Sequence, residues 1–253
     1  MEKIEYLIRI LCDERQLFPP SLTEENSFDI YRSLVNVREP GEIGEEYLRT
    51  EDEVLKKAIL EKGITDVRML KAVEPHIFLW QGDITTLKCD AVVNAANSGM
   101  TGCYAPCHNC IDNCIHTFAG VRLRLSCDRL MKMQGFPEPV GRAKITDAFN
   151  LPSRYVIHTV GPQVANGKPT PTQQKELASC YRSCMETAVE YGCGNIAFCC
   201  ISTGVFGYPG KEAARIAVDE VRSFVRSHEL NVIFNVFTDE DKNNYRSVLG
   251  IDE

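Results

Sequence analysis

Five short apolar runs mark out the sequence beyond residue 75 and constrain its fold more than any other feature. Each run is continuous rather than alternating with polar residues, which is typical of strands buried on both faces of a sheet. Apolar residues at helical spacing fall between the runs, at residues 173–191 and 211–227. Strands that alternate with helices predict an α/β fold with a largely parallel sheet. The predicted strands are 77–80, 91–93, 155–158, 196–201 and 232–237.

Polar residues follow directly after these runs. Ligands of parallel sheets bind beyond the carboxyl ends of the strands, so these residues are the candidate site. Asp83 is suited to accept a hydrogen bond from an amino group such as that of adenine, or to cap the following turn. Asn94 and Asn97 are suited either to the hydroxyl groups of a ligand or to hydrogen bonds within a turn. His158 falls inside a predicted strand, and we interpret it as structural.

The segment from Ser202 to Pro209 holds two glycines between a predicted strand and a predicted helix. Consecutive backbone amides in such a loop can point at one anion, assisted by the helix N-terminus. A plain tight loop is the alternative. The sequence lacks the G-x-G-x-x-G and G-x-x-x-x-G-K-[ST] patterns, so the usual dinucleotide and P-loop arrangements are not expected.

The charge balance narrows the choice of partners. The 253 residues include 28 Lys and Arg against 35 Asp and Glu, a formal net charge of −7. A protein that binds duplex nucleic acid needs a basic face, so nucleic acid is not an expected partner.

No apolar run approaches the roughly 20 residues of a membrane helix, and the first residues lack a signal-peptide pattern. We therefore expect a cytoplasmic protein with no membrane partner.

Residues 1–72 are predicted to form a helical extension and residues 73–253 the main domain. Leu7, Ile10 and Leu11 have the spacing of one helix face. Gly63 is a predicted helix stop. No constellation of catalytic residue types occurs in this segment, so we expect it to pack on the main domain.

The chain has twelve cysteines, five of them between residues 103 and 127. In a reducing compartment the scattered seven behave as small hydrophobes, whereas a cluster that includes histidine indicates a metal site. Pro106 keeps the preceding residue out of helical geometry, so ligands can converge in a loop, and residues from Asp112 onward are predicted to be helical. Thiolate and neutral imidazole are the ligands that zinc prefers. The candidate donors are Cys103, Cys107, His108, Cys110, Cys114 and His116.

Four stretches, in this order, resemble the macrodomain family, whose members are ADP-ribose-binding modules: 82–85, 90–97, 155–162 and 201–207. The resemblance implies a three-layer α/β/α fold with a mixed, largely parallel central sheet. It implies that Asp83 holds the adenine amino group with Ile84 nearby, and that Asn97 faces the ribose distal to adenine. Phe237 is the candidate aromatic residue for stacking on adenine. The residues implied around the diphosphate and distal ribose are Ser202, Thr203, Gly204, Val205 and Phe206.

The loop after Asn97 departs from the glycine run and Asp of many hydrolytic macrodomains. It is similar instead to the zinc-containing branch of the family, whose loop carries a C-x4-H-x-C set. Carried over to this sequence, the zinc ligands are Cys103, His108 and Cys110. Three protein ligands leave a fourth position open, as in catalytic zinc sites. The alternatives are a closed structural site that adds Cys107 or Cys114, and no metal at all, with the cysteines simply packed.

This resemblance implies a zinc-dependent hydrolase that removes mono-ADP-ribose from protein side chains, acidic ones in particular, and releases ADP-ribose. Asn97, Cys103, His108 and Cys110 would form the catalytic group. The implied partners are ADP-ribose, mono-ADP-ribosylated protein and a companion sirtuin-like ADP-ribosyltransferase. Two alternatives stay open: a module that binds ADP-ribose without turning it over, and a deacetylase of O-acetyl-ADP-ribose.

Overall fold

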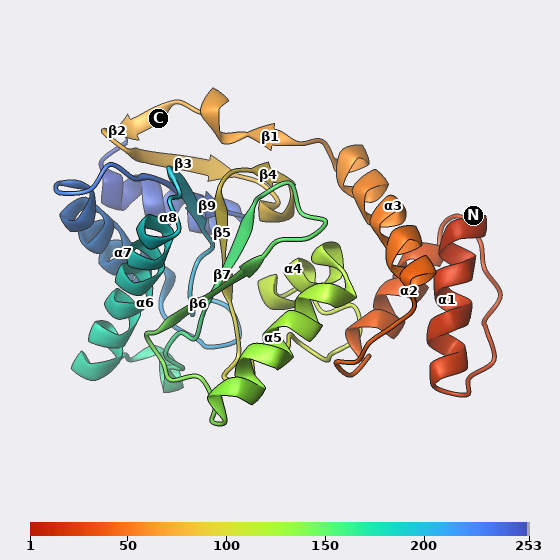
Figure 1. Ribbon diagram of the computed structural model, residues 1–253. Helices are drawn as coiled ribbons and strands as arrows, with labels where there is room; N and C mark the ends of the chain where they lie inside the picture. The colour runs from red at the N-terminus through yellow and green to blue at the C-terminus, as the bar shows by residue number, and fades with distance from the viewer. Residues whose placement is uncertain (252–253) are drawn as a thin grey trace.

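The computed structural model describes residues 1–251, and a seven-stranded sheet lies at its centre (Figure 1). The strand order is β2-β3-β9-β8-β5-β7-β6. The five inner strands pair in parallel, whereas β2 and β6 pair antiparallel at the two edges. All five predicted strands are present, and the predicted mixed, largely parallel sheet is confirmed. The strands are β2 (Ala72–Glu74), β3 (Ile77–Gln81), β5 (Ala91–Ala95), β6 (Ala143–Asp147), β7 (Tyr155–Thr159), β8 (Asn195–Phe198) and β9 (Asn231–Val236).

The apolar runs do not reveal the two edge strands, because an edge strand is not buried along its whole length. In β6 only Thr146 is buried, and Asp147 is exposed. The strand expected at 196–201 ends earlier, at Phe198, because the chain enters a turn at Ile201. Two further short strands, β1 (Thr65–Asp66) and β4 (Leu87–Lys88), form a separate parallel pair.

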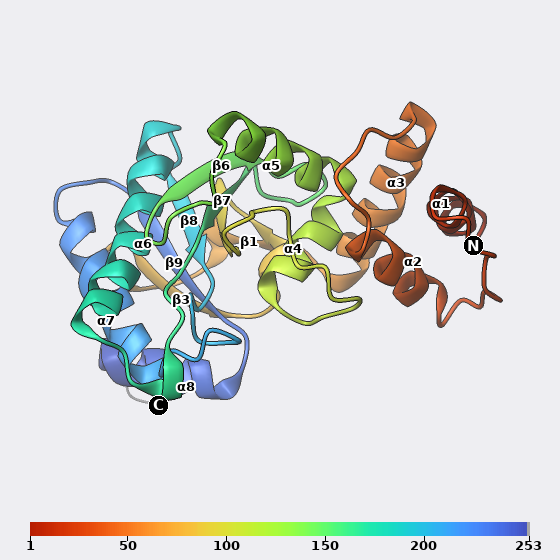
Figure 2. The same cartoon turned by 90° about the horizontal axis from the view of Figure 1, so that it is seen from below.

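Helices cover both faces of the sheet, which confirms the three-layer α/β/α architecture (Figure 2). On one face Tyr181 of α6 lies against Phe198, and Tyr245 of α8 lies against Phe234 of β9. The other face is covered by α4 and α5. Within residues 1–251 no helix is both long enough and apolar enough to cross a membrane. The helices of the two layers are α4 (Ile111–Ala119), α5 (Val121–Gln134), α6 (Pro171–Glu190), α7 (Gly210–Val225) and α8 (Asp239–Leu249). Three 3-10 turns lie in the connections: η1 (Val67–Met69), η2 (Ile84–Thr86) and η3 (Ala165–Gly167).

Three N-terminal helices form a second, smaller core on the far side of α4 and α5 (Figure 2). They are α1 (Glu2–Glu14), α2 (Ser27–Asn36) and α3 (Glu45–Lys62). After α3 the chain runs through β1 and η1 into β2, so the last part of the predicted helical extension consists of short strands and a 3-10 turn instead. The boundary between residues 72 and 73 stays a prediction.

A buried carboxyl group joins these helices to the main body. Glu51 of α3 is fully buried and accepts hydrogen bonds from the hydroxyls of Tyr31 and Tyr47, at 2.7 and 3.3 Å. It also accepts one from the amide of Val121, the first residue of α5, at 3.0 Å. Gly120 separates α4 from α5 with a φ of 91°, and a Cβ there would lie 2.6 Å from Glu51 Oε2, so only glycine fits. Burial raises the pKa of Glu51 to about 7, against the lowering effect of the hydrogen bonds.

Glu51→Gln is expected to remove a pH dependence of stability. An acid with a higher pKa in the folded state binds more protons when folded, so its contribution is complete below about pH 4.5 and is lost as the pH rises to about 7. This loss amounts to about 3 kcal/mol. A glutamine amide can accept from the Val121 amide through its oxygen and donate to the two tyrosine hydroxyl oxygens through its NH2 group. Urea unfolding of the variant should therefore give a flatter stability profile across that range. Parallel profiles for variant and parent would contradict the prediction.

Candidate functional site

The five parallel strands run in the same direction, so their carboxyl ends meet along one side of the sheet. This carboxyl edge is distinct from the edge strands β2 and β6. Asp83 follows β3, Asn97 follows β5 and Phe237 follows β9. Residues 202–206 follow β8. The fold therefore brings the residues expected from the sequence to the same edge, although they are far apart in the chain.

Asp83 caps the turn η2 and is paired with the N-terminal helices. Its Oδ1 accepts from the Thr85 amide at 2.9 Å and from the Thr85 hydroxyl at 2.7 Å. Its Oδ2 lies 2.8 Å from Nζ of Lys62, the last residue of α3. Burial raises the pKa of Asp83, but Lys62 and Thr85 outweigh it and hold the pKa below its ordinary value. The ionised side chain stays 34% exposed, so it can still accept a hydrogen bond from a ligand.

Phe237 and Ile84, both expected near adenine, differ in exposure. Phe237 is 73% exposed, and Gln81 of β3 donates to its carbonyl oxygen at 3.3 Å. Phe237 and Asp83 thus lie at neighbouring strand ends. Ile84 is 2% exposed. Its side chain belongs to the core, so any contact with a ligand would fall to its backbone.

A buried carboxyl group, Asp112, holds the start of the loop after β5. Its two oxygens accept from Asn94 Nδ2 at 2.8 Å and from Asn97 Nδ2 at 3.3 Å. Asn97 Nδ2 also donates to the Gly102 carbonyl at 3.0 Å, which fixes the chain just before Cys103. Burial raises the pKa of Asp112 to about 6, against the lowering effect of the asparagines and of Arg124. The sequence indicated Asp112 only as the beginning of a helix.

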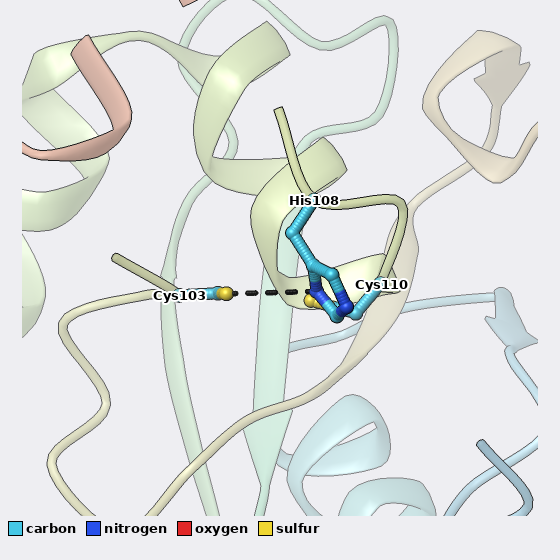
Figure 3. Close-up of side chains that lie close together, drawn as sticks. All are labelled: Cys103, His108 and Cys110. Atoms are coloured by element: carbon cyan, nitrogen blue, oxygen red, sulfur yellow. Dashed lines mark hydrogen bonds between the residues drawn. The ribbon is translucent and has the colours of Figure 1, made fainter. Parts of the chain in front are cut away.

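Cys103, His108 and Cys110 come together in the loop between β5 and α4, with the Cys103 sulfur directed at the His108 ring (Figure 3). Their ligand atoms all lie within 4.8 Å of one another, and Cys103 Sγ is 3.7 Å from His108 Nδ1. Zinc bonds of about 2.3 Å to sulfur and about 2.0 Å to nitrogen give a tetrahedral S–N separation of about 3.5 Å, so the group fits this metal. Cys110 is the N-terminal cap of α4. The predicted convergence of these residues outside a helix is confirmed.

The neighbouring thiols are held by other partners. Cys107 donates to the Asp29 carbonyl at 3.4 Å, and Cys114 Sγ accepts from Arg32 at 3.6 Å. Neither thiol joins a group of three metal-type donors within residues 1–251. The arrangement favours a site with three protein ligands over the closed alternative.

A second group of metal-type side chains, His116, Cys127 and His158, is buried. His158 Nδ1 lies 3.2 Å from Asn94 Nδ2, and its Nε2 lies 3.0 Å from the Thr146 hydroxyl. The asparagine amide donates to Nδ1, which leaves the ring proton on Nε2 for Thr146. Both ring nitrogens are therefore satisfied by protein groups, which supports the structural interpretation of His158.

The loop after β8 has the features of an anion cradle. Ser202 is buried with a left-handed φ of 68°, and its hydroxyl has no partner within the described residues. The backbone amides of Gly204, Val205 and Phe206 donate to no backbone acceptor in the part of the chain that the structure describes. Three successive free amides can together donate to a phosphate group.

Lys62 and Arg32 are two residues near this edge that no sequence pattern indicated. Lys62 bonds to Asp83, and Arg32 donates to the carbonyl of His108. These contacts span 21 and 76 residues of chain. Local spacing cannot reveal such a contact, because each is a single basic residue of an ordinary helix.

The sequence matches one protein family across the middle of the main domain. The profile of the Macro domain family matches residues 93–217. A protein-ADP-ribose hydrolase of Treponema medium is 48% identical over 98% of this chain and 96% of its own length. The chain belongs to the Macro domain family. A protein-ADP-ribose hydrolase of Staphylococcus aureus strain MSSA476 is 46% identical over 99% of this macrodomain chain and 96% of its own length, so both matches include the N-terminal helices.

Solved macrodomains share the fold of this macrodomain. The Trypanosoma brucei macrodomain in complex with ADP-ribose has a TM-score of 0.64 and 35% identity, covering 74% of this chain and 77% of its own. The Oceanobacillus iheyensis macrodomain with ADP has a TM-score of 0.64 and 34% identity, covering 72% of this chain and 94% of its own. Each of the two leaves over a quarter of this chain unmatched.

Gly161→Ala is expected to destabilise the macrodomain through the loop after β8. A Cβ on Gly161 would lie 2.1 Å from Ser202 Oγ and 2.8 Å from Ile201 Cγ2. Overpacking of this kind costs about 1–3 kcal/mol. Gly204→Ala is the matched control, because a Cβ there meets no atom within 4 Å. Urea unfolding should detect the loss only in Gly161→Ala, and equal stability of the two variants would contradict this packing.

Proposed function

We propose that this macrodomain is a zinc-dependent hydrolase that removes mono-ADP-ribose from modified protein side chains and releases ADP-ribose. The observation that carries the proposal is the group formed by Cys103, His108 and Cys110, three zinc-type donors at the strand edge that also carries the anion cradle. Two relatives that match nearly the whole chain are named protein-ADP-ribose hydrolase, and a solved macrodomain of similar fold holds ADP-ribose. These likenesses support the same class of substrate.

ADP-ribose would lie along the edge with its adenine toward β3 and β9. Asp83 would accept a hydrogen bond from the adenine amino group, and the exposed ring of Phe237 would stack on adenine. The free amides of residues 204–206 would hold the diphosphate. This arrangement suits a chain of net charge −7, because it needs no basic side chain. The distal ribose would then lie toward Asn97.

Cys103, His108 and Cys110 would hold the metal, and zinc bound there would supply Lewis-acid chemistry beside the distal ribose. Asn97 would orient the ribose while Asp112 and the Gly102 carbonyl keep its amide in place. A water oxygen bonds to the anomeric carbon as the bond from that carbon to the side-chain oxygen breaks. The carboxylate leaves with the bonding electrons, and the surplus water proton passes to solvent.

The finer parts of the proposal rest on the resemblance of the cysteine-rich loop to the zinc-containing branch. They are the acidic nature of the modified side chain and a sirtuin-like transferase as the source of the modification. A reducing, cytoplasmic location is proposed from the twelve cysteines, none of which forms a disulfide in the structure.

Loss of a zinc ligand should remove hydrolysis while leaving the chain folded. Cys103→Ser and His108→Ala are expected to lose zinc in elemental analysis and to release ADP-ribose at least about 100-fold more slowly. Mass spectrometry would follow release from proteins modified at Glu or Asp, at Ser and at Arg. Cys107→Ser is the matched control, because this thiol of the same loop lies outside the three-donor group.

A folded, zinc-free Cys103→Ser protein with full activity would contradict the mechanism. Loss of zinc from Cys107→Ser would indicate the closed structural site instead. A parent protein that binds ADP-ribose but hydrolyses no modified protein would favour a binding module. Activity confined to O-acetyl-ADP-ribose would favour a deacetylase.

Asp83→Ala is expected to weaken ADP-ribose binding by roughly 10-fold or more, because a hydrogen bond to a charged group contributes about 1.5–3 kcal/mol. Titration calorimetry with ADP-ribose would measure the change. Asp66→Ala is the matched control: Asp66 caps η1 as Asp83 caps η2, by accepting from the amide two residues ahead. Equal affinity in the two variants would remove Asp83 from the adenine contact.

A further inference from the structure

We infer that Arg32 and Asn36 of α2 are positioning residues for the cysteine loop, defined as residues 103–110. The inference extends the proposed function, because it makes the N-terminal helices part of the metal site. The two residues lie four apart in one helix and therefore share a face, and that face meets the loop.

The direct contacts hold two successive residues of the loop. Arg32 Nη2 donates to the carbonyl of His108 at 2.7 Å. Asn36 Oδ1 accepts from the amide of Cys107 at 3.0 Å. Asn36 is 1% exposed, and its Nδ2 donates to the Thr117 hydroxyl of α4 at 2.9 Å, so its amide orientation is fixed.

Asn113 connects Arg32 to the two cysteine ligands through hydrogen bonds. Its Oδ1 accepts from Arg32 at 3.0 Å, which turns its Nδ2 toward the carbonyl of Cys103 at 3.3 Å. The backbone amide of Asn113 donates to Cys110 Sγ at 3.4 Å. Asn113 is fully buried. Each of the three ligand residues is thus joined to α2, directly or through this one asparagine.

The loop needs such contacts because it has no regular structure of its own. Cys107 has a φ of 53°, a left-handed conformation that a residue other than glycine keeps only when its surroundings fix it. Groups that orient metal ligands from outside the ligand set commonly change metal affinity by about 10–100-fold when they are removed. Arg32 and Asn36 are placed to act in this way.

Cobalt titration of the full chain tests the inference through the absorption bands of thiolate-bound Co²⁺. Arg32→Ala and Asn36→Ala are expected to weaken Co²⁺ binding by about 10–100-fold in competition with a chelator. Hydrogen exchange of the metal-free chain should become faster in residues 103–110.

Arg32→Lys should recover part of the affinity, because an ammonium can still donate to the His108 carbonyl. Arg49→Ala is the matched control: it removes a guanidinium from an exposed position of α3 and should change neither measurement.

Parental Co²⁺ affinity together with parental loop exchange in both alanine variants would overturn the inference. A loss of affinity that only follows a loss of global stability, measured by urea unfolding of the metal-free variants, would also overturn it. If the parent binds no Co²⁺, the zinc proposal fails separately. Loop exchange then decides the positioning role, because unchanged exchange overturns it and faster exchange supports it.

Discussion

The common direction of β3, β9, β8, β5 and β7 is the constraint on which the rest of the structure depends. Strands buried on both faces are mostly apolar, and polar side chains inside them, such as His158, need partners within the protein, so groups free to meet a ligand gather where the strands end. Since these five strands end at one edge, groups as distant in sequence as Asp83 and Phe237 become neighbours. The same edge receives the free amides after β8 and the donors after β5. This edge is where we propose that ADP-ribose binds.

The loop after β5 raises a different physical problem, because residues 96–110 form neither helix nor strand. Irregular loops of this length are uncommon in compact domains unless they are functional. Here buried polar contacts replace secondary structure: Asp112 fixes the beginning of the loop, and α2 contacts its outer side through Arg32 and Asn36. Glu51 in turn ties the N-terminal helices to α5. The metal-type geometry therefore depends on a part of the chain that lies outside the sheet.

The strands and site residues that were predicted correctly are those that local sequence patterns reveal. Continuous apolar runs revealed the five inner strands, whereas the partly exposed edge strand β6 has no such run. The donors of the cysteine loop could be named from residue types, Pro106 and the family resemblance, and the structure brings Cys103, His108 and Cys110 together. Contacts between distant segments were not predictable, because Arg32 is unremarkable in a helix until the fold places His108 beside it. Resemblance alone would also not reveal that Ile84 is buried in the core.

Zinc K-edge X-ray absorption of the full chain, purified without added metal and without chelators, tests the central claim most directly. We expect one zinc per chain with two sulfur ligands at about 2.3 Å and lighter nitrogen or oxygen ligands at about 2.0–2.1 Å. The two sulfur ligands would be Cys103 and Cys110, and the lighter ligands would be His108 and a non-protein oxygen. A shell of three or four sulfur atoms, or a protein that takes up no zinc at all, would contradict an open site built on this loop.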